Sequence, residues 1–332
     1  MTTRRLLSIG AALILAGSAV AACGGGGDAK TTKSSGPADL SKVTLRVGDQ
    51  KGGARALLTA AGELKDVKYK ITWSQFTSGP PLLEAANAGA IDVGAVGNTP
   101  PIFAAAAGSK ITVVGAGDQS AEAQAVLVPK TSAIQKIQDL KGKKIALAKG
   151  SSAHALFLSV VQKAGLKLSD VQPQYLQPAD ALAAFSAGKV DAWVIWDPFT
   201  AQAEAQTGAR RLVSDAGYTS NYNFNVAAKS ALSDNGKVAA LGDYLARYRR
   251  ALTWVNTHQD QWATTWAQQI GLSLPIAKVA VSRRVTAWVP IDDKVITAEQ
   301  QLADQFSNAK VLPTKINFGD FVDTRFNSAG TQ

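Results

Sequence analysis

Cysteine and histidine are almost absent from this sequence. Its 332 residues include one cysteine, Cys23, and two histidines, His154 and His258. A single thiol excludes an intrachain disulfide, a redox thiol pair and a metal site built from cysteines. The histidines are not at metal-ligand spacing, and neither a Gly-x-Ser-x-Gly nucleophile motif nor a phosphate loop ending in Gly-Lys-Ser/Thr occurs. We therefore expect no catalytic residue, no metal and no cofactor.

Long hydrophobic runs are also missing, apart from one near the N-terminus. Residues 1–22 include Arg4 and Arg5, followed by an apolar stretch over residues 9–22 that is rich in alanine and glycine. This stretch is too short to span a bilayer, and the pattern is typical of an export signal. We therefore expect the protein to be exported.

The lone cysteine ends a Val-Ala-Ala-Cys motif over residues 20–23, which matches the lipobox of bacterial lipoproteins. Residues 23–42 are mostly glycine, serine, threonine, lysine and proline, which predicts a flexible tether. We expect lipidation at Cys23, with the protein at the outer face of the cytoplasmic membrane or in the periplasm. The alternative is a soluble exported protein cleaved after Ala21, in which Cys23 is incidental.

Acidic residues are scarcer than basic ones. The chain has 35 Lys and Arg against 25 Asp and Glu, for a formal net charge of +10. The basic residues occur as scattered pairs, such as Lys143-Lys144 and Arg249-Arg250, without interleaved aromatic residues or one basic helix. This distribution indicates solvated surfaces and argues against nucleic-acid binding. A diffuse positive field also favours encounter with a small anion.

One passage occurs twice. Residues 88–93 (Ala-Gly-Ala-Ile-Asp-Val) return as residues 187–192 (Ala-Gly-Lys-Val-Asp-Ala), at an offset of 187 − 88 = 99 positions. A second echo links Lys-Gly-Gly at residues 51–53 with Lys-Gly-Ser at residues 149–151. The repeat predicts two similar lobes built from strand, turn and helix units. The alternative is two unrelated units that share an aspartate.

Alternating strand and helix patterns run through both copies of the repeat. We expect strands at residues 44–48, 70–76, 91–96, 111–115, 144–147, 174–176 and 190–195, and helices at residues 54–64, 80–88, 100–107, 151–164 and 180–187. Extended runs at residues 124–128 and 223–227 are interpreted as two crossings between the lobes. The sequence thus predicts an α/β fold with a mostly parallel sheet in each lobe. Lobe 1 covers residues 43–127 and 223–332, and lobe 2 covers residues 128–222.

The C-terminal third is expected to be helical support. Apolar residues between positions 237 and 258 follow a 3.6-residue period, and Trp262 and Trp266 continue that pattern, which favours core packing. Thr297 with Gln300 forms a capping-box sequence for a last helix through Phe306.

Three predicted turns carry small or hydroxyl residues where a strand gives way to a helix. They are Ser78-Gly79-Pro80-Pro81, Asn98-Thr99-Pro100-Pro101 and Gly150-Ser151-Ser152. Such turns expose backbone N–H groups at the positive end of a helix dipole, which suits an anion. Ligands bind α/β sheets at the carboxyl ends of the strands, so these turns would face each other across a cleft. Each turn taken alone is an ordinary helix cap.

Aromatic side chains near these turns are candidates for an apolar wall. Trp193 and Trp196 point to opposite faces of one strand, and Trp196 is nearer the strand end. We expect Trp196 and Phe224 to reach the site. Asp197 either contacts the ligand or caps the next helix, and His154 either donates to the ligand or fills the surface between the lobes.

Four segments together resemble the motif series of aliphatic-sulfonate-binding proteins, the extracytoplasmic receptors of ABC importers. They are residues 47–52, 97–101, 149–154 and 193–199, and the resemblance spans residues 43–230. It implies a type II periplasmic-binding-protein fold, a lipid anchor and an ABC permease as partner. The sulfonate donors that it implies are Gln50, Ser78, Gly79, Gly97, Asn98, Thr99, Ser151 and Ser152. Gln124, where relatives carry a small residue, is a further candidate contact.

We therefore expect an exported, monomeric lipoprotein that captures an aliphatic sulfonate or similar organic oxyanion and delivers it to an ABC importer. Two alternatives stay open: an enzyme of the thiamine-pyrimidine-synthase-like fold group, and a sensor lipoprotein on the same scaffold. The sequence does not distinguish a sulfonate from taurine, nitrate or a sulfate ester.

Overall fold

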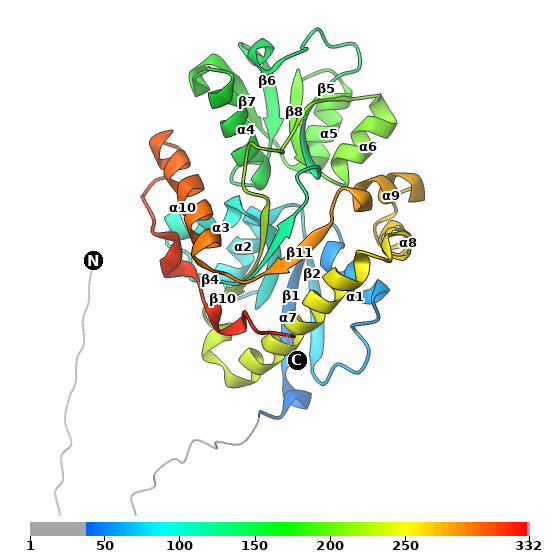
Figure 1. Cartoon of the computed structure of the whole chain (residues 1–332), viewed down its shortest axis with the longest axis vertical. Helices are drawn as coiled ribbons and strands as arrows, with labels where there is room; N and C mark the ends of the chain where they lie inside the picture. The colour runs from blue at the N-terminus through cyan, green and yellow to red at the C-terminus, as the bar shows by residue number, and fades with distance from the viewer. Residues whose placement is uncertain (1–37, 331–332) are drawn as a thin grey trace, which may run out of the picture. The chain divides into compact units, whose positions relative to one another are not determined.

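Two β-sheets organise the part of the chain that the computed structural model describes, residues 38–330 (Figure 1). These residues form one compact unit. The predicted export signal, the lipidation site and most of the tether lie outside the described residues. None of the helices within residues 38–330 is long and apolar enough to cross a membrane.

The first sheet, which we call lobe 1 together with its helices, has six strands in the order β11-β4-β10-β3-β1-β2. Its strands are β1 (Thr44–Gln50), β2 (Lys70–Phe76), β3 (Val93–Gly97), β4 (Ile111–Gln119), β10 (Tyr222–Ala228) and β11 (Thr286–Val289). Its helices are α1 (Gly53–Ala60), α2 (Gly79–Asn87), α3 (Thr99–Ala106), α7 (Asn235–Val255), α8 (Gln259–Ile270), α9 (Leu274–Ser282) and α10 (Asp293–Asn308).

The second sheet, which with its helices is lobe 2, has five strands in the order β7-β6-β8-β5-β9. Its strands are β5 (Gln124–Val128), β6 (Lys144–Leu147), β7 (Gln172–Tyr175), β8 (Ala192–Trp196) and β9 (Arg210–Ser214), and its helices are α4 (Ser152–Lys163), α5 (Pro178–Ser186) and α6 (Phe199–Thr207). Short 3-10 turns occur at Leu40–Lys42, Ile137–Leu140, Leu168–Asp170, Ala231–Ser233, Phe318–Phe321 and Thr324–Phe326. The α/β, two-lobed architecture predicted from the repeat is confirmed.

The sequence repeat corresponds to a repeat in hydrogen bonding. In lobe 1, β1 pairs in parallel with β2 and β3, and in lobe 2, β6 pairs in parallel with β7 and β8. Asp92 Oδ2 accepts from the Arg46 amide at 2.8 Å, and Asp191 Oδ2 accepts from the Lys144 amide at the same distance. Each aspartate comes directly before the last parallel strand of its lobe and therefore connects the start of that strand to the first strand by a hydrogen bond.

The two crossings lie outside the segments predicted for them. Residues 124–128 form β5, which pairs antiparallel with β8 inside the second sheet, so lobe 1 gives way to lobe 2 after Gln119 rather than at residue 127. Residues 223–227 belong to β10, which pairs with β3 and β4, so the return connector is residues 215–221. An extended sequence pattern does not indicate which sheet a strand joins. The observed lobe boundaries therefore differ from the predicted ones.

The last long helix also begins earlier than expected. It starts at Asp293, and its cap is Asp292, whose side chain accepts from the Val295 amide at 3.1 Å. The capping-box sequence at Thr297 and Gln300 lies inside the helix, where Gln300 instead donates to Asp304 at 2.9 Å. The Asp292 cap satisfies an N-terminal amide that the helix itself leaves unpaired.

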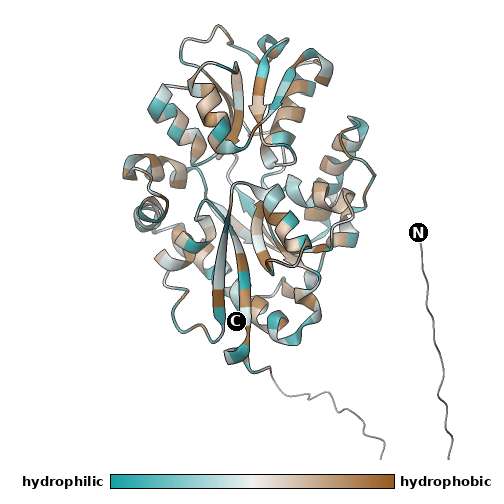
Figure 2. Ribbon diagram, turned by 180° about the vertical axis from the view of Figure 1, so that it is seen from behind, coloured by the Kyte–Doolittle hydropathy of each residue, from teal (hydrophilic) through white to brown (hydrophobic). Residues whose placement is uncertain are grey.

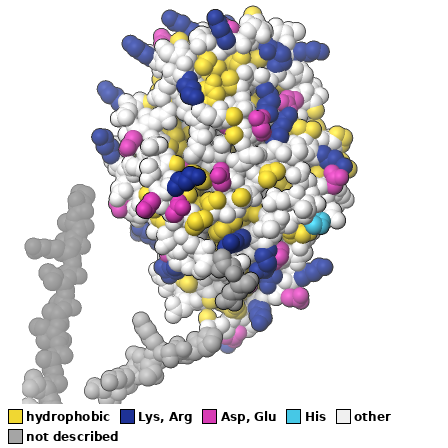
Figure 3. All heavy atoms as spheres, viewed as in Figure 1, with side chains coloured by type: hydrophobic (Ala, Val, Ile, Leu, Met, Phe, Trp, Pro, Cys, Tyr) yellow, Lys and Arg dark blue, Asp and Glu magenta, His cyan; other side chains and the backbone are white. Residues whose placement is uncertain are grey.

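Apolar side chains fill the space between each sheet and its helices. Figure 2 shows hydrophobic residues along the strands of both sheets and on the helices beside them. Leu241, Leu245 and Val255 are buried in lobe 1, in agreement with the helical period predicted for residues 237–258, and so is Trp266, which continues it. Lys and Arg side chains are spread over both lobes on the face shown in Figure 3, rather than gathered into one stripe.

Candidate functional site

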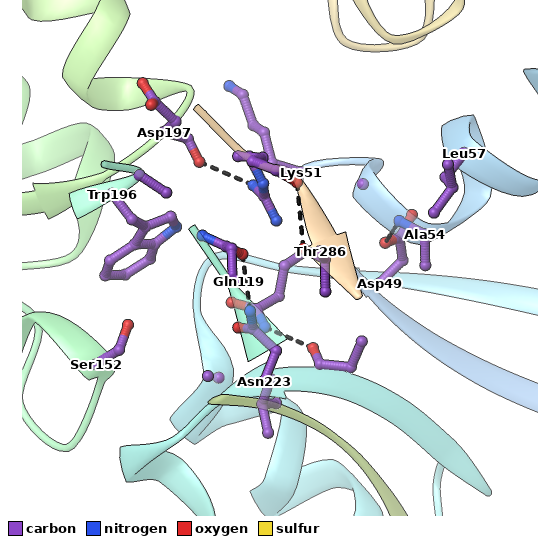
Figure 4. A pocket seen from close by; sticks show the side chains of 18 of the residues that line it. Asp49, Lys51, Ala54, Leu57, Gln119, Ser152, Trp196, Asp197, Asn223 and Thr286 are labelled. Atoms are coloured by element: carbon purple, nitrogen blue, oxygen red, sulfur yellow. Dashed lines mark hydrogen bonds between the residues drawn. The ribbon is translucent and has the colours of Figure 1, made fainter. Parts of the chain in front are cut away.

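A cavity of about 120 Å³ lies between the two lobes, at the carboxyl ends of the parallel strands. Lobe 2 contributes Ser152 and Trp196, which face Gln119 and Asn223 of lobe 1 across it (Figure 4). The lining residues predicted from the sequence are Gln50, Gly79, Gly97, Gln124, Ser151, Ser152, Trp196 and Asp197. Residues that the sequence reasoning missed are Asp49, Lys51, Gln119, Asn223, Tyr248, Leu252, Trp262, Arg284 and Thr286.

Two of the predicted turns meet across the boundary between the lobes. Gly97, at the end of β3, faces Ser152, the first residue of α4. A Cβ on Gly97 would lie 2.9 Å from Ser152 Cβ and 3.0 Å from its Oγ, so a side chain at position 97 would collide with lobe 2. Glycine is therefore required for this close approach, which brings the N-terminus of α4 to the cavity.

Neutral hydrogen-bonding groups line much of the lobe 1 wall. Gln50 Nε2 donates to the Ala95 carbonyl at 2.7 Å, and Asn223 Nδ2 donates to Gln119 Oε1 at 2.7 Å. These bonds hold the amide side chains in fixed orientations beside the cavity. Prearranged neutral donors bind an anion with little reorganisation.

Arg284 brings a positive charge to the cavity. Its Nη1 donates to the Asp197 carbonyl at 2.9 Å, and its guanidinium lies 5.3 Å from the Trp266 ring centroid. Burial lowers the pKa of Arg284, an effect that the nearby charges of Tyr248, Asp197 and Asp49 oppose. Within residues 38–330, no carboxylate oxygen forms an ion pair with this guanidinium. A bound anion would supply the missing partner.

Two buried carboxyl groups also line the cavity, and both cap helices. Asp49 Oδ1 accepts from the Ala54 amide at 3.0 Å, and Asp197 Oδ1 accepts from the Ala201 amide at 2.9 Å. Burial raises the pKa of Asp49 to about 6 and that of Asp197 to about 7. Burial thus favours the neutral form of the Asp197 carboxyl, against the opposing effects of the Ala201 amide and of Arg283, Arg284 and Arg211, and a neutral carboxyl repels an anion less.

Five predicted site residues do not line the cavity. Ser78 Oγ donates to Gln177 Oε1 of lobe 2 at 2.9 Å, and Asn98 Nδ2 donates to the Ser220 carbonyl at 2.6 Å. Thr99 Oγ1 donates to Asn98 Oδ1 at 2.9 Å, so both side chains of this turn are engaged with protein groups. The other two, His154 and Phe224, are buried among aromatic rings.

The placement of Phe224 follows from strand alternation. Phe224 packs on Phe318 in the core, and its neighbour Asn223 faces the cavity instead. Period-two alternation along β10 would have assigned the polar residue to the cleft and the aromatic one to the core. The same alternation gave the right result in β8, where Trp196 lines the cavity and Trp193 is fully buried.

The apolar side of the cavity comes from the C-terminal helices. Tyr248 and Leu252 of α7 and Trp262 of α8 line it, and Arg284 follows α9. The helical period of Tyr248, Leu252 and Trp262 predicted that these residues pack in the core. In the structure they also face the cavity. No local pattern in the sequence marks that contact.

Comparison with known proteins agrees with this geometry. The NMT1/THI5-like family model matches residues 78–261. An aliphatic sulfonates-binding protein of Escherichia coli K12 is 39% identical over 284 residues, which cover 84% of this chain and 88% of the relative.

Two solved structures share the fold over most of their length. The alkanesulfonate-binding protein SsuA from Xanthomonas axonopodis pv. citri, bound to MOPS, is 36% identical with a TM-score of 0.76, covering 84% of this chain and 98% of that one. The periplasmic aliphatic sulphonate binding protein SsuA from Escherichia coli is 36% identical with a TM-score of 0.73, covering 84% of this chain and 92% of that one. The chain therefore belongs to the NMT1/THI5-like family and, within it, to the aliphatic-sulfonate-binding proteins with a periplasmic-binding-protein fold.

Proposed function

We propose that this protein captures an organic sulfonate between its two lobes and delivers it to an ABC importer. The observation that carries the proposal is Arg284, a guanidinium at an interlobe cavity with no carboxylate partner within the described residues. A sulfonate supplies the missing negative charge and three acceptor oxygens. The names and titles of the relatives refer to the same class of ligand.

The donors around the cavity can supply the required affinity. Hydrogen bonds to a charged group contribute about 1.5–3 kcal/mol each, and a micromolar complex corresponds to roughly −8 kcal/mol. Arg284, the amide of Ser152 at the start of α4, and the fixed amide of Gln50 are the donors we assign. They come from both lobes, so a bound sulfonate favours the state in which the lobes are together.

An organic tail would meet the apolar side of the cavity. Trp196 stands on the lobe 2 side, and Tyr248, Leu252 and Trp262 stand on the lobe 1 side. These side chains exclude water from an alkyl or cyclic tail. This arrangement favours an organic sulfonate over an inorganic anion such as nitrate.

We assign a receptor role rather than an enzymatic one. The cavity presents no cysteine or histidine side chain, and its two carboxyl groups are used as helix caps. Together with the N-terminal sequence motifs, this supports a monomeric receptor that is exported and held at the membrane by a lipid on Cys23.

Calorimetry with alkanesulfonates of increasing chain length, with MOPS and with matched carboxylates tests the proposal. We expect micromolar or tighter binding of at least one sulfonate, weaker binding of its carboxylate analogue, and recovery of the ligand unchanged by mass spectrometry. Arg284→Gln and Ser152→Ala should each weaken binding by about 1–3 kcal/mol. Arg250→Gln, which removes an exposed pair with Glu63, is the control. Absence of binding to every sulfonate, or release of sulfite, would contradict the proposal.

A further inference from the structure

We propose that His154 is a positioning residue, which holds the serine turn (residues 150–152) in its anion-binding shape when the two lobes are in contact. This inference rests on the proposed function, because it assigns a role to the turn that would bind the sulfonate. His154 itself does not line the cavity, so its role would be indirect.

The imidazole accepts a hydrogen bond from the backbone of the turn. The Gly150 amide donates to His154 Nδ1 at 3.1 Å, and the His154 amide donates back to the Ser151 carbonyl at 2.8 Å. Ser151 Oγ donates to the Ala148 carbonyl at 2.7 Å. Gly150 has φ of +73°, a conformation that glycine tolerates and other residues rarely adopt. The side chain of His154 thus completes a turn whose geometry is unusual.

The same imidazole is packed by lobe 1. Its ring centroid lies 5.5 Å from that of Phe103 in α3 and 5.2 Å from that of Phe306 in α10. Within lobe 2 it contacts Phe157 and Tyr175, with centroids 6.2 and 5.7 Å away. His154 is only 1% exposed. About half of its aromatic surroundings would therefore be lost if the lobes separated.

Burial keeps this imidazole neutral, as an acceptor must be. Burial and then the charge of Lys149 lower the pKa of His154 to about 4. Lys149 lies over the Tyr175 ring on the lobe 2 side, whereas the two rings that lobe 1 packs against His154, Phe103 and Phe306, are uncharged. The proton of the neutral ring must then be on Nε2, because Nδ1 accepts from Gly150.

Separation of the lobes would weaken the hydrogen bond between the Gly150 amide and His154 Nδ1. Water would reach the imidazole and compete for Nδ1, and the Gly150 amide would lose its fixed partner. Contact between the lobes excludes water from the ring, and the turn that it holds presents the amide of Ser152 to the cavity. Closure and the shape of the anion-binding turn are thereby coupled through one side chain, and a bound anion favours both.

Two variants test the hydrogen-bond acceptor and the aromatic ring of His154 separately. His154→Phe keeps an aromatic side chain between Phe103 and Phe306 but has no acceptor, and His154→Asn keeps an acceptor near the Nδ1 position but loses the ring. We expect His154→Phe to keep a melting temperature near that of the parent while its Kd for MOPS rises roughly tenfold. We expect His154→Asn to melt at a lower temperature while its Kd stays within about threefold of the parent.

The outcomes distinguish this inference from the proposed function. If the parent protein binds no sulfonate, the proposed function fails. If the parent binds MOPS and His154→Phe binds it equally well, or if both variants lose affinity equally, the positioning role of His154 is wrong. Nitrogen-15 NMR of the parent gives a test that needs no variant: we expect an unprotonated Nδ1 and a protonated Nε2, and the opposite tautomer would overturn the inference.

Discussion

The hydroxyl of Ser220 donates a hydrogen bond to Glu299 Oε1 at 2.7 Å, and this contact ties the second interlobe connector to α10. Glu299 is fully buried, and its Oε2 has no partner within the described residues. Burial, only partly offset by the Ser220 bond, raises the pKa of Glu299 to about 8. Ser220 also accepts from Asn98 Nδ2, which lies at the start of α3. Hydrogen bonds therefore connect the start of α3 through Ser220 to Glu299 in α10.

Replacing Glu299 with Gln should remove one component of the pH dependence of stability. Between about pH 4.5 and 8 the folded state keeps the Glu299 proton and the unfolded state has lost it, so this group makes stability fall as pH rises. The slope is about 1.4 kcal/mol per pH unit. Urea unfolding at pH 6 and pH 8 should show a smaller decrease for Glu299→Gln than for the parent. Glu122→Gln, on an exposed side chain, is the control, and equal slopes for parent and Glu299→Gln would contradict the prediction.

The internal repeat supplies a matched pair of aspartates. Asp92 is fully buried and pairs with Arg46 at 2.6 Å and with Lys237 at 2.9 Å. Asp191 accepts from the Lys144 amide and forms no ion pair within residues 38–330. Burial alone would raise the pKa of Asp92, but the bonds from Arg46 and Lys237 outweigh it and lower the pKa.

We expect Asp92→Asn to lower the free energy of unfolding by about 2–4 kcal/mol, because two cations lose their partner, and Asp191→Asn to lower it by about 1 kcal/mol or less. Urea denaturation at pH 7 measures both. Equal losses would mean that the ion pairs of Asp92 add nothing to the hydrogen bond that the repeat preserves.

An ion pair joins the lobes beside the cavity. Arg283, after α9 of lobe 1, contacts Glu204 in α6 of lobe 2 at 2.8 Å, and both side chains are about one-fifth exposed. Because this pair forms between the lobes, Glu204→Gln should destabilise their contact and raise the Kd for a sulfonate by about two- to fivefold at low salt. The difference from the parent should shrink in 1 M salt. Glu63→Gln, which breaks a pair within lobe 1, should leave the Kd unchanged; a similar effect of both variants would argue against a role for the interlobe pair.

The proposed lipid anchor makes a prediction about fractionation. Cys23 follows a lipobox sequence and precedes a polar tether, so Cys23→Ser should abolish lipidation and move the protein from the membrane to the soluble fraction of its host. Mass spectrometry of the parent should show a diacylated N-terminal cysteine. Equal membrane retention of parent and Cys23→Ser would rule out this anchor.

Much of the architecture could be predicted because it depends on local patterns. Strand and helix periods, proline at helix starts and the repeated Ala-Gly-x-x-Asp passage identified the two lobes and most of their elements. Strand alternation in β8 predicted that Trp193 and Trp196 point to opposite faces, and the position of Trp196 nearer the strand end favoured it for the cleft. Glycine at position 97 sits in a turn motif that was visible before its packing against Ser152 was known.

Sequence by itself therefore determined the order of most strands and helices up to β10, the two-lobed plan and the turns at the cleft. The tertiary structure alone decided which sheet β5 and β10 join, that Arg284 and Trp262 reach the cavity from the C-terminal region, and that His154 lies between the lobes. The physical reason is the range of the interactions. Helix caps and alternation are set within a few residues. Strand partners and cavity walls instead depend on segments far apart in the chain, such as Gln124 and Trp196, 72 positions apart, or Gly97 and Asn223, 126 positions apart, and no local pattern records these contacts.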